Sequence, residues 1–316
     1  MWRYALKRIL LMIPVIIGVS FLIFFIMNLA PGSYLEMQAA EEGLTTAELE
    51  ALMEEYGYND NIFVRYFRYM YNFVQGDLGN SYTTGNPVLE EYMSKVPATA
   101  KLAVASMTVS VVLSLLLGII GALKRGTLID NGCMALSFLG LSIPNFWLGI
   151  MLMLLFTSTL HWLPSSGDQG WKSLIMPAIT VGTGLTATLA RTTRSSMLDV
   201  LNQDYLRTAR AQGIPERQVI MKYGLRNALI PIITIAGGQF AVCLGGSVVT
   251  EKVFSWPGVG RLIVDSVSSR DVPMVTGCII LKTFTIGLVV LAVDLLYAVI
   301  DPRIKAQYAK GGKKRK

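Results

Sequence analysis

The sequence has few of the side chains on which metal sites and acid–base catalysis depend. Its 316 residues include one histidine, His161, and three cysteines, which all fall in apolar segments without paired spacing. These counts argue against a metal site, a disulfide framework and a His-dependent catalytic triad. Only 16% of the residues are charged, which is little for a soluble domain of this length.

The short motifs of nucleotide and hydrolytic chemistry are also missing. The sequence has no G-x-x-x-x-G-K-[ST] phosphate loop, no H-E-x-x-H motif and no G-x-S-x-G motif. The ending AKGGKKRK contains a Gly-Lys pair, but neither Ser nor Thr follows it. We therefore predict a chain that is not an enzyme, with no catalytic residues, no metal and no cofactor of its own.

Apolar residues, in contrast, are abundant. They make up 53% of the chain and gather in runs long enough to cross a bilayer, which takes about 20 residues. We predict an all-α integral membrane protein with about six transmembrane helices, of which the first is an uncleaved span. The predicted spans cover residues 9–29, 99–122, 132–156, 174–191, 227–250 and 276–299. Pro144 near the middle of the third span predicts a kink there.

Basic residues are distributed unevenly between the segments that connect these runs. Residues 30–98 hold three basic residues and eleven carboxylates, whereas the segments on the other side of the predicted membrane hold most of the lysines and arginines. The positive-inside rule then places both termini in the cytoplasm. The formal net charge of +7 follows from these basic loops and needs no nucleic acid as a partner.

This pattern divides the chain into four parts. We predict an N-terminal tail with the first transmembrane helix (1–30), an acidic extracytoplasmic helical segment (31–98), a five-helix transmembrane core with a cytoplasmic loop at about 191–226 (99–300), and a basic cytoplasmic tail (301–316). Within the acidic segment, Thr45 to Glu48 predict a helix start, Gly57 predicts its end, and an aromatic helix follows. The segment is either a helical cap over the outer side or a docking surface for an external partner.

The stretch YLRTARAQGIPERQVIMKYGLRNALIP, residues 205–231, is cationic although apolar runs lie on both sides of it. Asn202 and Asp204 are candidate N-caps, Gly213 is placed to end a short helix with a positive φ, and Pro215 to begin the next one. So short a helix is marginal alone in water, so something must pack on it. Composition by itself also fits a positive-inside loop that rests on the membrane surface.

In this stretch three residues separate Arg207-Thr208-Ala209 from Gly213, and LRNALIP follows at 225–231. The pattern resembles the EAA loop of the inner-membrane permeases of ATP-binding-cassette importers, in the form found in the dipeptide and oligopeptide branch. Residues 223–226 depart from the general Ile-x-Leu-Pro form but suit that branch. Further segments resemble the same branch: RILLMIPVIIGVSFLIFFIMNLAPG, LSIPNFWLGI, LPSSG, VFSWPGVGRLIVDSVSSRD and LLYAVIDPRI.

The resemblance implies a type I ABC importer-like permease fold in a multi-pass protein of a prokaryotic cytoplasmic membrane. It implies import of dipeptides or oligopeptides by alternating access. The implied partners are a homologous second permease subunit, two ABC ATPase subunits that bind ATP and Mg, an extracytoplasmic solute-binding protein, the peptide substrate and membrane lipid. Two alternatives stay open. A permease of the same architecture would import nickel complexes, glutathione or another small solute, and a protein of another class would be a secondary transporter or a membrane scaffold.

In that family the loop forms a coupling helix that sits in a groove of the cytoplasmic ATPase. Carried over, the helix covers about 203–212, with Ala209 and Gly213 in close contact with the ATPase and Arg207 and Arg210 in polar contact at the rim. The residues to which the resemblance assigns this coupling role are Tyr205, Arg207, Thr208, Ala209, Arg210, Gly213 and Pro215.

Two further groups of residues are candidates for function. Ser142, Pro144, Asn145 and Lys282 either line the translocation path, or make helix–helix hydrogen bonds and, for Lys282, reach the outer headgroups. Trp256, Pro257, Gly258 and Arg261 form either an outer gate or receptor-docking element, or an interfacial helix with Trp256 in the aromatic belt. Asp294 is expected to pair with a base such as Arg303.

Overall fold

The computed structural model describes residues 2–29, 32–55 and 57–300, and all of its regular elements in these ranges are helices. The predicted basic tail 301–316, with Arg303, lies outside the described residues. Five helices are long and apolar enough to cross a membrane, and a bent pair of shorter helices brings the number to six if the pair forms one span. The all-α fold with about six spans is thereby confirmed.

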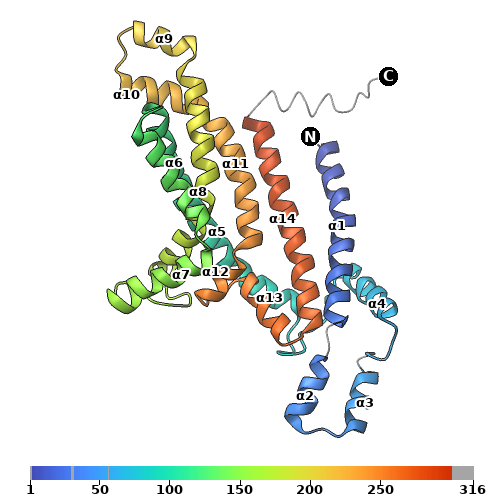
Figure 1. Cartoon of the computed structure of the whole chain (residues 1–316). Coiled ribbons are helices and arrows are strands. Elements are labelled where there is room, and N and C mark those ends of the chain that lie inside the picture. Colours follow the sequence, from blue (N-terminus) through green and yellow to red (C-terminus); the bar gives the residue numbers. More distant parts are fainter. Residues whose placement is uncertain (1, 30–31, 56, 301–316) are drawn as a thin grey trace.

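The five long helices are the frame of the molecule (Figure 1). They are α1 (Trp2–Leu29), α5 (Val88–Leu123), α8 (Trp171–Leu201), α11 (Leu225–Gly246) and α14 (Val272–Ile300). α5 and α8 pack most closely, because small residues let their backbones approach. A Cβ on Gly118 of α5, for example, would lie 2.8 Å from the carbonyl oxygen of Ala190 on α8.

The third predicted span is broken rather than kinked. α6 (Leu128–Ser142) ends before Pro144, and the chain continues as α7 (Asn145–Met153) and the π-helical turn η1 (Leu154–Thr159), bent by 94° from α6. Proline disfavours the helical conformation in the residue before it, and Ile143 is accordingly extended, with φ −84° and ψ 124°. The chain is thus disrupted at Pro144 as predicted, but as a full break between two helices and not as a kink within one helix.

The acidic outer segment forms three helices, α2 (Tyr34–Glu42), α3 (Thr46–Glu55) and α4 (Ile62–Val74). The predicted start of α3 is confirmed as a reciprocal cap. The carboxylate of Glu48 accepts from the backbone N–H of Thr45 at 2.8 Å and from its hydroxyl at 2.7 Å. These hydrogen bonds stabilise the charged form and lower the pKa of Glu48 below its usual value.

At the opposite end of the bundle, α1 begins and α14 ends on the side that carries α9 (Asp204–Ala211), α10 (Glu216–Gln218) and the π-helical turn η2 (Val219–Gly224) (Figure 1). Arg8 of α1 and Asp294 of α14 form an ion pair at 2.6 Å there. Asp294 therefore pairs with a base on α1, and the expected partner, Arg303, lies outside the described residues.

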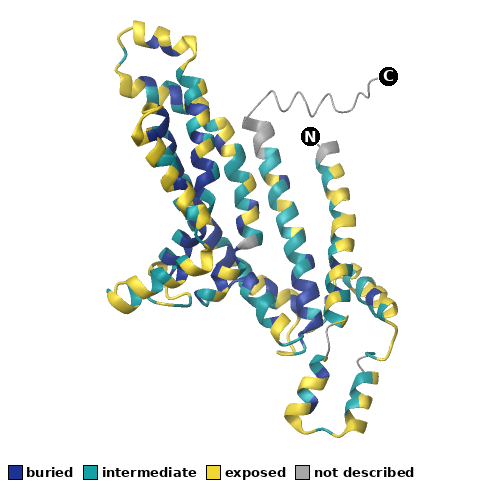
Figure 2. Ribbon diagram, in the orientation of Figure 1, coloured by how far each residue is buried: buried dark blue, intermediate teal, exposed yellow. Residues whose placement is uncertain are grey.

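Two short helices, α12 (Val248–Val253) and α13 (Val259–Ser268), connect α11 to α14 on the outer side. Burial is concentrated in α8, in the facing side of α5 and in these connecting helices, whereas α1 is exposed along much of its length (Figure 2). Large apolar side chains such as Leu10, Leu22 and Leu29 are among its exposed residues. Such a surface is stable in a lipid environment and costly in water.

Candidate functional site

The cytoplasmic loop connects α8 to α11 and contains the short helix α9, which projects from the end of the bundle (Figure 1). Gly213 follows α9 with a φ of +75°, so the predicted left-handed helix end is confirmed. The predicted N-caps were wrong, because Gln203 occupies that position without a side-chain hydrogen bond. Asn202 instead donates to the carbonyl of Leu198 at 3.0 Å and closes the end of α8. Pro215 precedes α10 as its cap rather than its first residue.

The inner face of α9 packs on the chain itself. Leu206 and Ala209, three residues apart, are buried against Val219 of η2. Partly buried apolar side chains close the sides of this small core: Val200, Leu201, Ile214 and Tyr223. The expectation that Ala209 offers close contact to a partner is therefore corrected, because its methyl group is used in packing α9 onto η2.

Arg210 also acts within the loop. Its guanidinium donates to both carboxylate oxygens of Glu216, with distances of 3.0 to 3.3 Å, across the turn at Gly213. A two-point guanidinium–carboxylate pair fixes the angle between α9 and α10 better than a single contact would. The loop thus supplies the packing that so short a helix needs.

The outer face of α9 is left to Tyr205, Arg207 and Thr208, which are all exposed. The side chain of Arg207 is 73% exposed and makes a long contact of 3.5 Å to Asp204. The hydroxyl of Tyr205 accepts from the Asn227 amide at 2.8 Å, which joins α9 to the start of α11. A partner that docks on α9 would thus meet these three side chains.

A buried ion pair holds the base of the loop, and sequence reasoning missed it. Asp130 of α6 is 2% exposed and accepts from Nε and Nη2 of Arg194 on α8, both at 2.6 Å. It also accepts from the backbone N–H of Gly126 at 3.0 Å. The one available signal was an acidic residue directly after a basic turn at the start of an apolar run. The pair couples α6 to the helix that leads into α9.

On the outer side, Trp256 is 1% exposed and packs on Ala98 and Leu102 of α5. Its Nε1–H donates to the carbonyl of Ala98 at 2.8 Å. The interpretation of Trp256 as an aromatic-belt residue was therefore wrong, because the indole is enclosed between α5 and the connecting helices. Buried tryptophan takes such a position when its N–H finds an acceptor.

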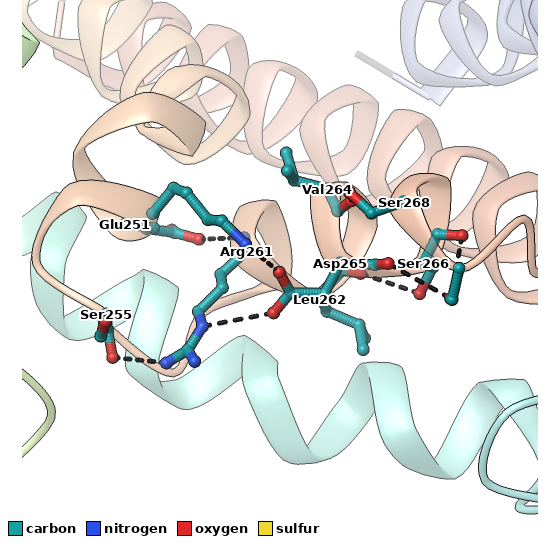
Figure 3. A network of polar contacts seen from close by, with 10 residues as sticks. Glu251, Ser255, Arg261, Leu262, Val264, Asp265, Ser266 and Ser268 are labelled. Carbon is teal, nitrogen blue, oxygen red and sulfur yellow. Dashed lines mark hydrogen bonds and ion pairs between the residues drawn. The ribbon is translucent and has the colours of Figure 1, made fainter.

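Beside Trp256 lies a buried carboxylate that the sequence did not single out. Glu251 of α12 is 1% exposed and accepts from the hydroxyls of Thr99 and Ser247 at 3.0 Å each. It also accepts from the backbone N–H of Arg261 at 3.0 Å, in the first turn of α13 (Figure 3). A carboxylate at a helix N-terminus satisfies free N–H groups and complements the helix dipole. Glu251 thus joins α12, α13 and α5.

Arg261 and its neighbours form the exposed side of this unit. The Arg261 guanidinium donates to the Ser255 carbonyl at 2.8 Å and to Asp265 at 3.3 Å (Figure 3). Together with Pro257 and Gly258 it lines a polar depression of about 590 Å³ between α13 and the outer end of α5. Of the four predicted outer residues, three therefore reach this depression, and Trp256 supports them from inside.

The predicted path residues lie in two separate places. Ser142, Pro144 and Asn145 form the break between α6 and α7, where the Ser142 hydroxyl donates to the Phe138 carbonyl at 3.0 Å. Lys282 of α14 instead faces a small cavity lined mainly by α5, α13 and α14. The described residues do not bring the two groups together, and a path-lining role stays a prediction for both.

These features define a class of protein: a multi-pass helical membrane protein with a self-supported cytoplasmic helix, as transporter permeases have. The model of the family described as "Binding-protein-dependent transport system inner membrane component" matches residues 114–306. The model of the corresponding N-terminal membrane component matches residues 1–103. The chain belongs to this family of inner-membrane permease components of binding-protein-dependent ABC transport systems.

Curated relatives match along almost the whole chain. The oligopeptide transport system permease protein AppB of Bacillus subtilis is 40% identical over 96% of this chain and 100% of its own length. The glutathione transport system permease protein GsiC is 42% identical in Salmonella paratyphi A and 41% in Escherichia coli K12, in each case over 96% of this chain and 99% of the relative.

Among solved structures, a chain of the MetNI methionine ABC transporter in an inward-facing conformation covers 67% of this chain with a TM-score of 0.56. The match extends over 97% of the neighbour's chain, and the sequence identity is 19%. This likeness supports the fold alone. The type I importer permease fold expected from the sequence is confirmed.

Proposed function

We propose that the chain is the permease subunit of an ATP-driven importer that carries dipeptides or oligopeptides into a prokaryotic cell by alternating access. The observation that carries the proposal is the likeness, over 96% of the chain, to a permease named for oligopeptides. A second candidate substrate is glutathione, because permeases named for it match over the same share of the chain. Glutathione is itself a short peptide, so one kind of path could serve both.

The partners in this proposal are a homologous second permease, two ATPase subunits that bind ATP and Mg, and an extracytoplasmic solute-binding protein. α9 is the proposed contact with one ATPase, through Tyr205, Arg207 and Thr208. The exposure of these side chains on a helix held by its own core supports that role, because a rigid helix transmits the motion of its partner to the bundle. Ala209, Arg210, Gly213 and Pro215 give the helix its shape.

Gly213 provides the test of coupling. Nothing lies within 4 Å of a Cβ at this position, so a substitution acts through backbone strain and not through a clash. A β-branched residue is strained at a φ of +75°, at a cost of about 1–2 kcal/mol, whereas Asn tolerates that region. We expect Gly213→Val to lower uptake several-fold while ATP hydrolysis continues, and Gly213→Asn to behave like the wild type.

The measurement uses the assembled transporter, with its ATPases and solute-binding protein, in liposomes. Uptake of a labelled peptide and release of phosphate are followed in the same samples. Equal ratios of uptake to hydrolysis in Gly213→Val and the wild type would rule out the coupling role of this loop.

The substrate is tested by competition in the same liposomes. Unlabelled dipeptides, longer peptides, glutathione and a nickel complex are compared as inhibitors of uptake. We expect peptides of one length class to compete most strongly, because the external binding protein delivers what it selects. Competition by glutathione alone would favour the second candidate, and competition by the nickel complex alone would contradict both.

A further inference from the structure

Helix α4 of the outer segment packs against α1 well inside the apolar run of that span. Tyr66 is buried between Phe21 and Phe24, with ring centroids 5.3 and 5.6 Å away. Its hydroxyl reaches the carbonyl of Ile17 at 3.2 Å. Ile17 lies twelve residues before the end of α1 at Leu29, which is about 18 Å along the helix axis. α4 therefore lies beside the outer half of the span, with α2 and α3 beyond its end (Figure 1).

A second face of α4 is apolar and, apart from its edge at Phe63, uncovered by the described parts of the chain. Phe67, Tyr71 and Val74 are 67%, 68% and 80% exposed, and Phe63 and Val64 are exposed beside them. At 3.6 residues per turn these five positions fall within about 100° of the helix circumference. A stripe of this width is what a surface helix turns toward an apolar environment.

The third face of α4 is polar and held in place. The guanidinium of Arg68 pairs with Asp60 at 2.7 Å, and Arg65 lies 4.1 Å from the ring centroid of Tyr58. Both partners come from the loop that follows α3. The cations are thereby directed toward the outer segment and away from the apolar stripe, as in helices that lie in the plane of a membrane interface.

The apolar stripe continues the membrane-exposed side of α1. Phe63 at its edge lies against Phe25 and Phe21, with centroids 5.6 and 6.4 Å apart. The neighbouring α1 residues Leu22 and Ile26 are 59% and 60% exposed and belong to the span itself. Because α1 crosses the bilayer, the contacts of Phe63 with Phe21 and Phe25 join the stripe on α4 to a lipid-exposed helix.

We propose that α4 is an interfacial anchor that inserts the stripe Phe63, Val64, Phe67, Tyr71 and Val74 among the acyl chains of the outer leaflet. It fixes the extracytoplasmic segment to the membrane surface beside α1. The inference depends on α1 being a membrane span and not on the identity of the transported solute.

Nitroxide labels on single cysteines test the proposal in the assembled transporter, reconstituted in phosphatidylcholine–phosphatidylglycerol vesicles. Cys133, which is partly exposed, is replaced by Ser, whereas Cys243 and Cys278 are buried. The labels are placed at Phe67→Cys and Tyr71→Cys on the stripe. Asn72→Cys on the polar face of the same helix is the matched control, and retained ATPase activity shows that each variant is assembled.

Collision rates with oxygen, which concentrates in lipid, and with a water-soluble nickel chelate are then compared. We expect the oxygen-to-nickel ratio to be several-fold higher at Phe67→Cys and Tyr71→Cys than at Asn72→Cys. Shielding of both stripe positions from both reagents would mean that a protein partner covers them, and equal access of the chelate to stripe and control would mean that the stripe faces water. Either result overturns the proposal.

Discussion

Replacing Asp130 with alanine is expected to destabilise the transporter more than the loss of any exposed ion pair. The variant leaves the Arg194 guanidinium, 28% exposed, and the N–H of Gly126 without their acceptor. Breaking a fully buried pair costs about 3–5 kcal/mol, and the partial exposure of Arg194 reduces this to about 2 kcal/mol. Because α8 continues toward α9, we also expect uptake to fall more than ATP hydrolysis.

The matched control is Asp60→Ala, which removes the acceptor of Arg68. In that pair both side chains are largely exposed, at 56% and 44%, so the expected change is below about 1 kcal/mol. Thermal unfolding of the purified complex in detergent compares the two variants. Arg194→Lys keeps the charge but loses the two-point geometry and should fall between them. Equal melting temperatures for Asp130→Ala and Asp60→Ala would contradict the stabilising role of the Asp130–Arg194 pair.

The second large effect is expected from Gly258→Ala at the start of α13. An added methyl group would overlap the carboxylate of Glu251. That carboxylate cannot move away without losing its hydrogen bonds to Thr99, Ser247 and the Arg261 N–H. Overpacking of this kind costs about 1–3 kcal/mol, and any shift of Glu251 also leaves buried donors unpaired. We expect a lower melting temperature and loss of most uptake.

Gly238→Ala in α11 is the control for this prediction. A Cβ at Gly238 would have nothing within 4 Å, and the residue is helical. Alanine is favoured over glycine in a helix by about 1 kcal/mol, so this variant should be neutral or slightly stabilised. Melting temperature and uptake are measured for both variants. A Gly258→Ala protein with the melting temperature and uptake of Gly238→Ala would show that the contact between Glu251 and α13 does not contribute to stability.

The coupling loop shows how far sequence patterns reach. Gly213 was predicted to have a positive φ, because few other residues end a helix in that way, and it does. Ala209 was predicted to face a partner, and it faces Val219 instead. The helical spacing of small residues identifies one face of α9. Whether that face turns inward or outward depends on the position of η2, which no local sequence pattern predicts.

The surroundings of Trp256 and Glu251 show the same limit. Tryptophan is typical of membrane interfaces, and only the packing of α5 against Trp256 makes this one buried. Glu251 carried no sequence signal, because a lone carboxylate after an apolar run looks like any loop residue. Its meaning comes from Thr99 and Arg261, which lie 152 residues before it and 10 after it.

The sequence by itself determined the membrane character, the number of spans to within one, the orientation and the family, because hydropathy, charge asymmetry and contiguous motifs are local properties of the chain. Tertiary structure decided the rest: the break at Pro144, the inward face of α9, the Asp130–Arg194 and Glu251 contacts, and the uncovered stripe on α4. Each of these depends on which distant helix lies opposite a side chain. Which helix lies opposite a given side chain is set by the packing of the whole bundle. A buried charge or a closely packed glycine is stable only where its particular neighbour is present.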